Sequence, residues 1–201
     1  LDNVDVAAAA EEGVVVTHVP DYCTDEVATH HLALLLDCVR GVARYDRAVR
    51  DGEWAWQAAS PLHRLRDRTV GVLSFGPIAR RFVDLLDGFD LSVLVHDPFV
   101  DAETVAEYGA ESVDYEELLA RSDYLSVHAP ETEATRGMVD ADALAALADD
   151  AVVVNTGRGA VIDEAALLDA LEADRVAAAA LDVLREEPPG DDHPLVGRED
   201  V

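Results

Sequence analysis

From about residue 66 onward, short apolar runs alternate with amphipathic stretches along the chain. The runs are rich in Val, Leu and Ala, as buried parallel strands are, and the stretches between them have helical spacing. The predicted strands lie near residues 69–74, 91–96, 123–127, 151–155 and 177–182, and the predicted helices near 77–87, 102–108, 114–120, 140–147 and 163–173. This alternation favours right-handed crossovers and an α/β fold with a doubly wound parallel sheet.

The first part of the chain has a different pattern. We predict a short helix near residues 5–12 and a strand over 13–19 that ends at Pro20. A long helix is predicted at about 25–50, with Thr24 as its cap. Apolar residues cover more than one stripe of the first half of this helix, which predicts that it is buried there on several sides.

Charge narrows the classes of partner. The chain has 42 acidic and 15 basic residues, a formal net charge of -27, and no Lys. Such a charge works against binding nucleic acid or an anionic membrane. Acid at this density indicates a halophilic protein, because in molar salt the Debye length shrinks to about 3 Å and self-repulsion is screened. The alternative is an acidic surface that serves solubility alone.

The cysteines and the first residues indicate the cellular compartment of the protein. Cys23 and Cys38 fit neither a disulfide framework nor a set of metal ligands, so we expect cytosolic thiols and no metal site. No signal peptide is recognisable and no apolar run approaches about 18 residues, which predicts a cytoplasmic protein. The sequence begins at Leu1 without Met, which indicates a fragment or a processed chain.

The turn after the first strand of the alternating region has the place of a G-x-G-x-x-G motif. Its three motif positions hold Ser74, Gly76 and Ala79. Gly76 keeps the side-chain-free position that lets a pyrophosphate approach the backbone, whereas Ser74 departs from the motif. Pro77 suits the first turn of a helix but has no N–H, so the amides from Ile78 onward are the candidate phosphate donors.

The strand that follows ends at Asp97, 21 residues beyond Gly76. An acid at this place accepts hydrogen bonds from ribose hydroxyls and repels a 2'-phosphate, which favours NAD over NADP. The alternative is that Asp97 only begins a turn with Pro98. The next strand leads into His128, Ala129 and Pro130 and on to Thr135, a candidate cofactor-binding segment beside the adenine and ribose. His128 has an alternative role as a structural histidine bonded to a backbone carbonyl.

Polar residues also follow the last two strands. Arg158 comes shortly after one strand, and Asp182 and Glu187 come after the other. Because ligands of parallel sheets bind beyond the carboxyl ends of the strands, we expect these three side chains around one crevice.

Taken together, these residues resemble the D-isomer-specific 2-hydroxyacid dehydrogenases, the family that includes phosphoglycerate dehydrogenases and the C-terminal-binding-protein corepressors. The segments that carry the resemblance are Asp2–Asp5, Val19–Ala28, His128–Thr135, Asn155–Gly159, Leu181–Val183 and Glu186–Pro188. The resemblance covers essentially the whole chain, and the segment from Tyr22 to Val27 leans toward the corepressor branch.

The resemblance implies roles for individual residues. Arg158 would bind the substrate carboxylate and polarise the keto oxygen, and Glu187 would hydrogen-bond to a catalytic histidine and favour its protonated form. Asp182 would face the nicotinamide. Three further residues would line the cofactor, namely Asn155, Thr156 and Gly157.

Parts of the family pattern are missing. The acid–base histidine of the family follows a later strand, so we interpret His193 as a different histidine and not as the catalyst. The family pattern is truncated at both ends. The resemblance implies a remnant of a flavodoxin-like substrate domain at 1–20 and a Rossmann-like NAD-binding domain, incomplete at its C-terminus, at 21–201.

The predicted function is an NAD-dependent oxidoreductase acting on the CH–OH group of a small D-2-hydroxy acid or on the matching 2-keto acid. Turnover by this chain without the histidine is not expected. The alternatives are an NAD(H)-sensing interaction module without catalysis and an inactive fragment. A homodimer is expected, with the 25–50 helix and the loop of Trp54 and Trp56 as its surface, although these Trp side chains could instead pack within one subunit.

Overall fold

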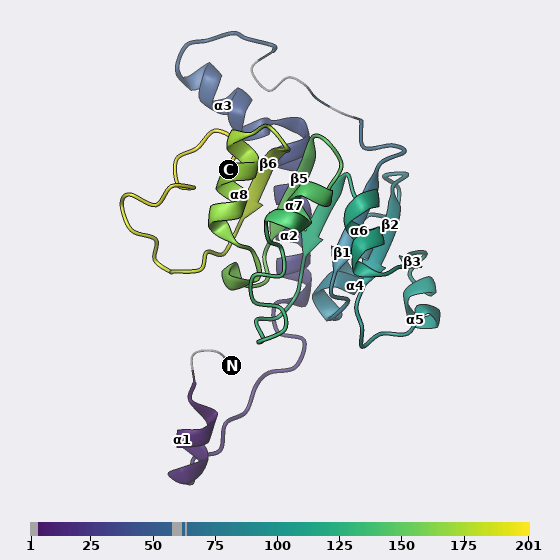
Figure 1. Ribbon diagram of the computed structural model, residues 1–201, viewed down its shortest axis with the longest axis vertical. Coiled ribbons are helices and arrows are strands. Elements are labelled where there is room, and N and C mark those ends of the chain that lie inside the picture. The colour runs from purple at the N-terminus through teal and green to yellow at the C-terminus, as the bar shows by residue number, and fades with distance from the viewer. Residues whose placement is uncertain (1–3, 58–61, 63) are drawn as a thin grey trace.

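The computed structural model describes residues 4–57, 62 and 64–201. Its centre is one parallel sheet of six strands in the order β3-β2-β1-β4-β5-β6 (Figure 1). The strands are β1 Thr69–Leu73, β2 Ser92–His96, β3 Glu111–Ser112, β4 Tyr124–Val127, β5 Ala151–Asn155 and β6 Val176–Leu181. The five strands predicted from the apolar runs are confirmed, and the order reverses between β1 and β4, as in a doubly wound fold.

Helices cover both faces of the sheet. The helices are α1 Val6–Glu11, α2 Thr24–Arg40, α3 Val42–Arg50, α4 Pro77–Leu85, α5 Ala102–Ala106, α6 Tyr115–Arg121, α7 Ala141–Ala146 and α8 Glu164–Glu172, with a 3-10 turn at Gly159–Val161. Side chains of α2, α4 and α5 share one core with alternate strand residues, and those of α6, α7 and α8 share the other. Burial on both faces explains why β1, β4 and β5 have no polar alternation.

The strand register fixes where the site can form. Leu73 is paired with both His96 and Val127, and Val127 is paired with Asn155, which is paired in turn with Leu181. The turns that follow β1, β2, β4, β5 and β6 therefore leave the sheet at the same edge.

Two predictions for the first part of the chain are wrong. Residues 14–19 are not a strand, because no strand lies beside them in the part of the chain that the structure describes; Val15 is 83% exposed. The single helix over 25–50 is two helices, because Gly41 takes a left-handed conformation (φ 60°) that ends α2. Nor does Thr24 cap α2: the cap position is Cys23, and Thr24 is the first helical residue.

Aspartates begin four of the helices around the sheet. The carboxylates of Asp101, Asp114, Asp140 and Asp163 accept hydrogen bonds from backbone N–H groups in the first turns of α5, α6, α7 and α8. A capping carboxylate satisfies an amide that has no partner within the helix and interacts favourably with the positive end of the helix dipole.

Among the described residues, none of the helices has the length and hydropathy of a bilayer-spanning segment.

Candidate functional site

The turn between β1 and α4 leaves room for a phosphate. Gly76 is the cap residue of α4, and a Cβ built on it would meet nothing within 4 Å. Pro77 occupies the first helical position, so the first amide of the helix that can donate is that of Ile78. The sequence predicts that the pyrophosphate of a dinucleotide binds in this open space at the helix N-terminus.

Ser74 takes a backbone conformation that glycine adopts more readily than other residues. Its φ is +73°, in the left-handed region that costs a residue with a Cβ about 1 kcal/mol or more. The Ser74 hydroxyl donates to Oδ2 of Asp97 at 3.2 Å. Ser74 therefore accepts a strained conformation at this turn and contacts the neighbouring acid.

Asp97 stands directly beyond β2 and is held by backbone amides. The N–H of Phe75 donates to Oδ2 at 2.7 Å, and the N–H of Phe99 donates to Oδ1 at 2.9 Å. These bonds fix the carboxylate beside the phosphate turn. The bond from Phe99 agrees with the alternative in which Asp97 begins a turn. Its bonds from Ser74 and Phe75, in the turn after β1, are not needed for that role.

The segment after β4 forms a closed loop. The Thr135 hydroxyl donates to the carbonyl of Pro130 at 2.5 Å and lies 3.0 Å from the Thr132 hydroxyl. The side chain of Thr135 therefore stabilises the loop by bonding to the loop's backbone, so its hydroxyl is directed into the loop. Ala129 is buried, and its carbonyl lies 3.0 Å from the position of a Cβ on Gly157, so the loops after β4 and β5 are in contact.

His128 belongs to a buried network that the sequence did not predict. Its Nε2 lies 2.8 Å from the Ser126 hydroxyl, which lies 2.6 Å from Nε2 of His31 in α2. The other nitrogen of His31, Nδ1, lies 2.8 Å from the Thr156 hydroxyl. The network agrees with the alternative of a structural role for His128, but the ring partner is a side-chain hydroxyl and not the predicted backbone carbonyl.

Burial keeps both rings of this network neutral. Desolvation lowers the pKa of His128 to about 3, and it lowers the pKa of His31 well below its usual value, with the nearby His128 adding to the effect. The unfolded chain therefore binds more protons than the folded chain below about pH 6.5.

We expect acid to destabilise the fold through these rings. A histidine with a depressed pKa stabilises the fold fully above pH 6.5 and less as the pH falls, so His128 should cost about 2 kcal/mol between pH 7 and pH 5. Denaturant unfolding at fixed salt across this range measures the loss. A His128→Leu variant should lose about 2 kcal/mol less than the natural chain, whereas the exposed His18→Gln variant should match it. Equal losses in all three proteins would exclude this origin.

The turn after β5 is built by Asn155. Its Oδ1 accepts from the N–H of Gly157 at 2.9 Å, and its Nδ2 donates to the carbonyl of Arg158 at 3.0 Å. Asn155 is buried, and its own carbonyl accepts from the N–H of Asp182 at 3.0 Å. The side chain of Asn155 therefore shapes the turn, and its backbone carbonyl joins the turn to the residue after β6.

Arg158 and Glu187 line the same hollow, of about 430 Å³, at this edge of the sheet. The exposed Arg158 donates from Nη1 to the Gly157 carbonyl at 2.7 Å. Glu187 is positioned by the N–H of Leu184, which donates to its Oε1 at 2.9 Å. The sequence prediction that these two residues border one crevice is in accord with this geometry.

Gly159 lets the turn that carries Arg158 approach the segment that leads to Glu187. A Cβ at this position would lie 2.0 Å from the carbonyl carbon of Leu184 and 2.4 Å from the N–H nitrogen of Arg185. The turn after Arg158 therefore rests directly on the backbone that leads to Glu187.

Asp182, the third residue expected at this crevice, follows directly after β6 and is not among the residues that line the hollow. Its Oδ1 lies 3.3 Å from Nε2 of His30, and both side chains are about half exposed. Neither His30 nor His31 was predicted as a site residue. The available signal was two adjacent imidazoles within the apolar first half of the 25–50 segment.

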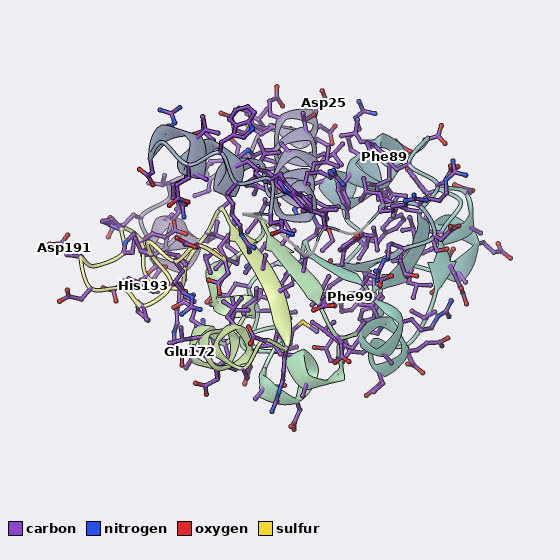
Figure 2. All side chains as sticks on the ribbon, turned by 90° about the horizontal axis from the view of Figure 1, so that it is seen from above. Asp25, Phe89, Phe99, Glu172, Asp191 and His193 are labelled. Atoms are coloured by element: carbon purple, nitrogen blue, oxygen red, sulfur yellow. The ribbon has the colours of Figure 1, made fainter. Side chains whose placement is uncertain are left out.

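His193 lies outside this arrangement. It belongs to the C-terminal loop that extends away from the sheet together with Asp191 (Figure 2), and its Nε2 lies 3.3 Å from Oε2 of Glu164. Among the described residues, no hydrogen bond joins a histidine to Glu187, and no group of three or more His, Cys, Asp or Glu side chains is arranged to hold a metal ion.

The fold and this edge together define a class of protein. An open turn at a helix N-terminus, an acid after the second strand, and ionisable side chains after the later strands characterise the dinucleotide-binding domain of a dehydrogenase. A family model described as D-isomer specific 2-hydroxyacid dehydrogenase, NAD binding domain, matches residues 32–201. The chain belongs to this family, and the cofactor of the domain is NAD.

Individual relatives give the same assignment. A D-3-phosphoglycerate dehydrogenase of Archaeoglobus fulgidus is 38% identical over 201 residues, which are 100% of this chain and 38% of the relative. A glyoxylate reductase of Aeropyrum pernix is 38% identical over 208 residues, covering 100% of this chain and 62% of the relative. The crystal structure of a glyoxylate reductase from Paecilomyes thermophila has a TM-score of 0.86 at 32% identity, covering 99% of this chain and 60% of that chain. The chain thus spans less than two thirds of each.

Proposed function

We propose that the protein containing this chain is an NAD-dependent oxidoreductase that interconverts a small D-2-hydroxy acid and the matching 2-keto acid. The observation that carries the proposal is the hollow shared by Arg158 and Glu187, at the edge of the sheet that also holds Gly76 and Asp97. Relatives named as dehydrogenases and reductases favour an enzyme over an interaction module without catalysis.

Each site residue would have its own role in binding or in the reaction. NAD supplies the hydride acceptor or donor. Arg158 holds the substrate carboxylate by paired hydrogen bonds and polarises the keto oxygen, since a guanidinium is planar and always charged. Glu187 orients an acid–base histidine contributed from outside residues 1–201, and Asp182 borders the nicotinamide. Asp97 binds the ribose hydroxyls with the lone pairs that the Ser74 hydroxyl and the amides of Phe75 and Phe99 leave open.

Two assays test this function separately. NADH titration of the 201-residue chain, followed by nicotinamide fluorescence, tests the cofactor site. Oxidation of NADH by a panel of 2-keto acids, catalysed by the longest reading frame that contains the chain, tests the reaction. Binding of NADH without turnover of any acid in the panel would favour the interaction module.

The first residues are proposed to belong to a second domain. We assign residues 1–20 to a flavodoxin-like substrate domain and the NAD-binding domain to residues 21–201. In support, α1 buries none of its residues and lies apart from the sheet (Figure 1), and the family match begins at residue 32. Asp2 and Asn3, which contribute to the resemblance, lie outside the described residues.

A homodimer is proposed through α2, α3 and the loop that follows them. Trp54 is 91% exposed and Trp56 is 79% exposed, so the alternative in which they pack within one subunit is wrong. Exposed indoles of this size are typical of interfaces. Light scattering in high salt should give twice the chain mass, and Trp54→Ser should shift the protein toward the monomer, whereas Phe99→Ser, a change at an exposed aromatic 93% accessible in the loop after β2, should not.

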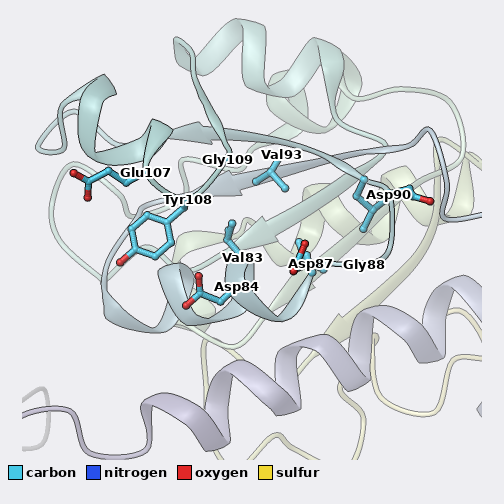
Figure 3. Close-up of a pocket in the computed structure, with 11 residues that line it drawn as sticks. Val83, Asp84, Asp87, Gly88, Asp90, Val93, Glu107, Tyr108 and Gly109 are labelled. Atoms are coloured by element: carbon cyan, nitrogen blue, oxygen red, sulfur yellow. The ribbon is translucent and has the colours of Figure 1, made fainter.

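Halophilic adaptation and a cytoplasmic location are further proposals. Carboxylates gather even on faces remote from the crevice: Asp84, Asp87, Asp90 and Glu107 line a hollow of about 400 Å³ between α4 and the loop after α5 (Figure 3). Repulsion among them is reduced by salt. Both cysteines are free, which suits a reducing compartment.

We therefore expect the melting temperature to rise steeply between about 0.1 M and about 3 M KCl. A double variant with Asp84→Asn and Asp87→Asn should need less salt for the same melting temperature, because it removes charge from the hollow without changing side-chain size. A melting temperature that does not depend on salt would leave solubility as the role of the acidic surface.

A further inference from the structure

A continuous chain of hydrogen bonds links α2 with β4 and with the turns that follow β4 and β5. It runs from the Thr156 hydroxyl to Nδ1 of His31 (2.8 Å), from Nε2 of His31 to the Ser126 hydroxyl (2.6 Å), and from that hydroxyl to Nε2 of His128 (2.8 Å). His31 is 0% exposed, so the groups inside the chain have only one another as partners.

Both imidazoles are neutral in this arrangement. The rings are 4.3 Å apart between centroids, and His31 also packs its edge on Phe82, a contact that gives no counter-charge. Among the described residues, no carboxylate is hydrogen-bonded to either ring. Burial lowers the pKa of each ring, in keeping with this geometry. Each imidazole therefore carries one ring proton, on either Nδ1 or Nε2.

Ser126 couples the two tautomers. Its hydroxyl has one proton and faces two Nε2 atoms, so it donates to one ring and accepts from the other. If both Nε2 atoms lacked a proton, one ring would face an oxygen lone pair without a bond. If both carried one, the Ser126 proton would be buried without an acceptor, at a cost of about 1–3 kcal/mol. The satisfied states are the two in which His31 and His128 have opposite tautomers.

These two states differ in the groups that the two ends of the hydrogen-bond chain, Thr156 and His128, can offer to a ligand. When His31 carries its proton on Nε2, its Nδ1 accepts from Thr156; the Thr156 oxygen then offers only lone pairs outward, and His128 carries N–H at Nδ1. When His31 carries its proton on Nδ1, Thr156 receives that hydrogen bond and its own proton is free to point outward, while Nδ1 of His128 is an acceptor.

We propose that His31 is a positioning residue whose hydrogen bonds make Thr156 and His128 complementary, so that one offers the dinucleotide a donor when the other offers an acceptor. The inference rests on the proposed function, in which both turns border NAD. The contact of the Ala129 carbonyl with the Gly157 backbone keeps the two turns together. NAD carries an amide N–H₂ as well as phosphate, ribose and carbonyl oxygens, so it can engage one end as a donor and the other as an acceptor.

The tautomers are tested first, in the 201-residue chain without any ligand. Long-range ¹H–¹⁵N correlation at neutral pH reports which nitrogen of each ring is protonated. We expect opposite tautomers in His31 and His128, and loss of this coupling in Ser126→Ala. The same tautomer in both rings, or a doubly protonated ring, would overturn the proposal whether or not the chain binds NADH.

A matched pair of variants then tests the positioning role. The amide of His31→Asn overlies the Nδ1 position and can keep the bond to Thr156, whereas the amide of His31→Gln overlies the Nε2 position and can keep only the bond to Ser126. We expect NADH affinity to fall about tenfold in His31→Gln, as for one lost hydrogen bond, and by clearly less in His31→Asn. Equal losses in the two variants at equal thermal stability would assign His31 a packing role only.

Failure of this inference is distinguishable from failure of the proposed function. If the unmodified chain does not bind NADH, the proposed function fails, and the tautomer measurement still decides whether the coupled network exists. If the unmodified chain binds NADH but the two variants do not differ, only the positioning role fails.

Discussion

Gly159→Ala should lower the free energy of unfolding by about 3 kcal/mol or more and, under the proposed function, abolish the reaction. The added Cβ would lie 2.0 Å from the carbonyl carbon and 2.2 Å from the carbonyl oxygen of Leu184. These are backbone atoms, which cannot rotate aside as a side chain can. Relief therefore requires the segment that leads to Glu187 to move away from the turn that carries Arg158.

Denaturant unfolding of the 201-residue chain measures this effect. Gly190→Ala is the matched control, because a Cβ there meets nothing within 4 Å and the residue lies only three positions beyond Glu187. The control should unfold like the natural chain. Equal stability of the two variants would show that the Leu184 backbone moves aside easily, and the rigid link between the halves of the hollow would be refuted.

Arg158→Ala should reduce kcat/KM for a 2-keto acid by about 10³-fold in the complete enzyme, with little change in NADH affinity. Under the proposed function, this variant removes a charged, two-pronged donor for the substrate carboxylate, which would also stabilise charge on the reacting oxygen. Arg158→Lys should recover little of the activity, because an ammonium cannot form the same pair of parallel hydrogen bonds.

Arg185→Ala is the control for charge alone. Arg185 lines the same hollow of about 430 Å³ and has the same formal charge, but it follows β6 and not the Asn155 turn. Its removal should change kcat/KM far less. Similar losses in both alanine variants would mean that the hollow attracts the acid by its overall field, and the specific role of Arg158 would have to be abandoned.

The sheet could be predicted from sequence because its strands are buried on both faces. Runs such as Val152–Val154 have no polar position, and each predicted strand agrees with the structure to within one or two residues. β3 was missed because Glu111 and Ser112 are exposed and carry no apolar pattern. The strand predicted over 13–19 failed for the opposite reason, since a run of valines forms a strand only beside a partner.

The crevice was predictable only in part. Parallel register places Arg158, Asp97 and Gly76 at one edge once the strands are known, so these positions follow from the pattern. The His31 network does not, because its partners are 95 and 125 residues away in the chain and no local spacing links them. The inward direction of the Thr135 hydroxyl likewise depends on a loop closure that the sequence does not encode in a recognisable motif.

The aspartates that begin α5 to α8 set a limit on redesigning the surface for fresh water. Asp101, Asp114, Asp140 and Asp163 each accept a bond from the backbone that they precede, so replacing them with lysine would reduce the charge and also remove a helix start. Carboxylates such as Asp84 and Asp87 have no such duty in the first turn of a helix. Some acidic residues thus stabilise helices, whereas others act only through their charge in the solvent. Only the second group can be replaced without loss of a helix cap.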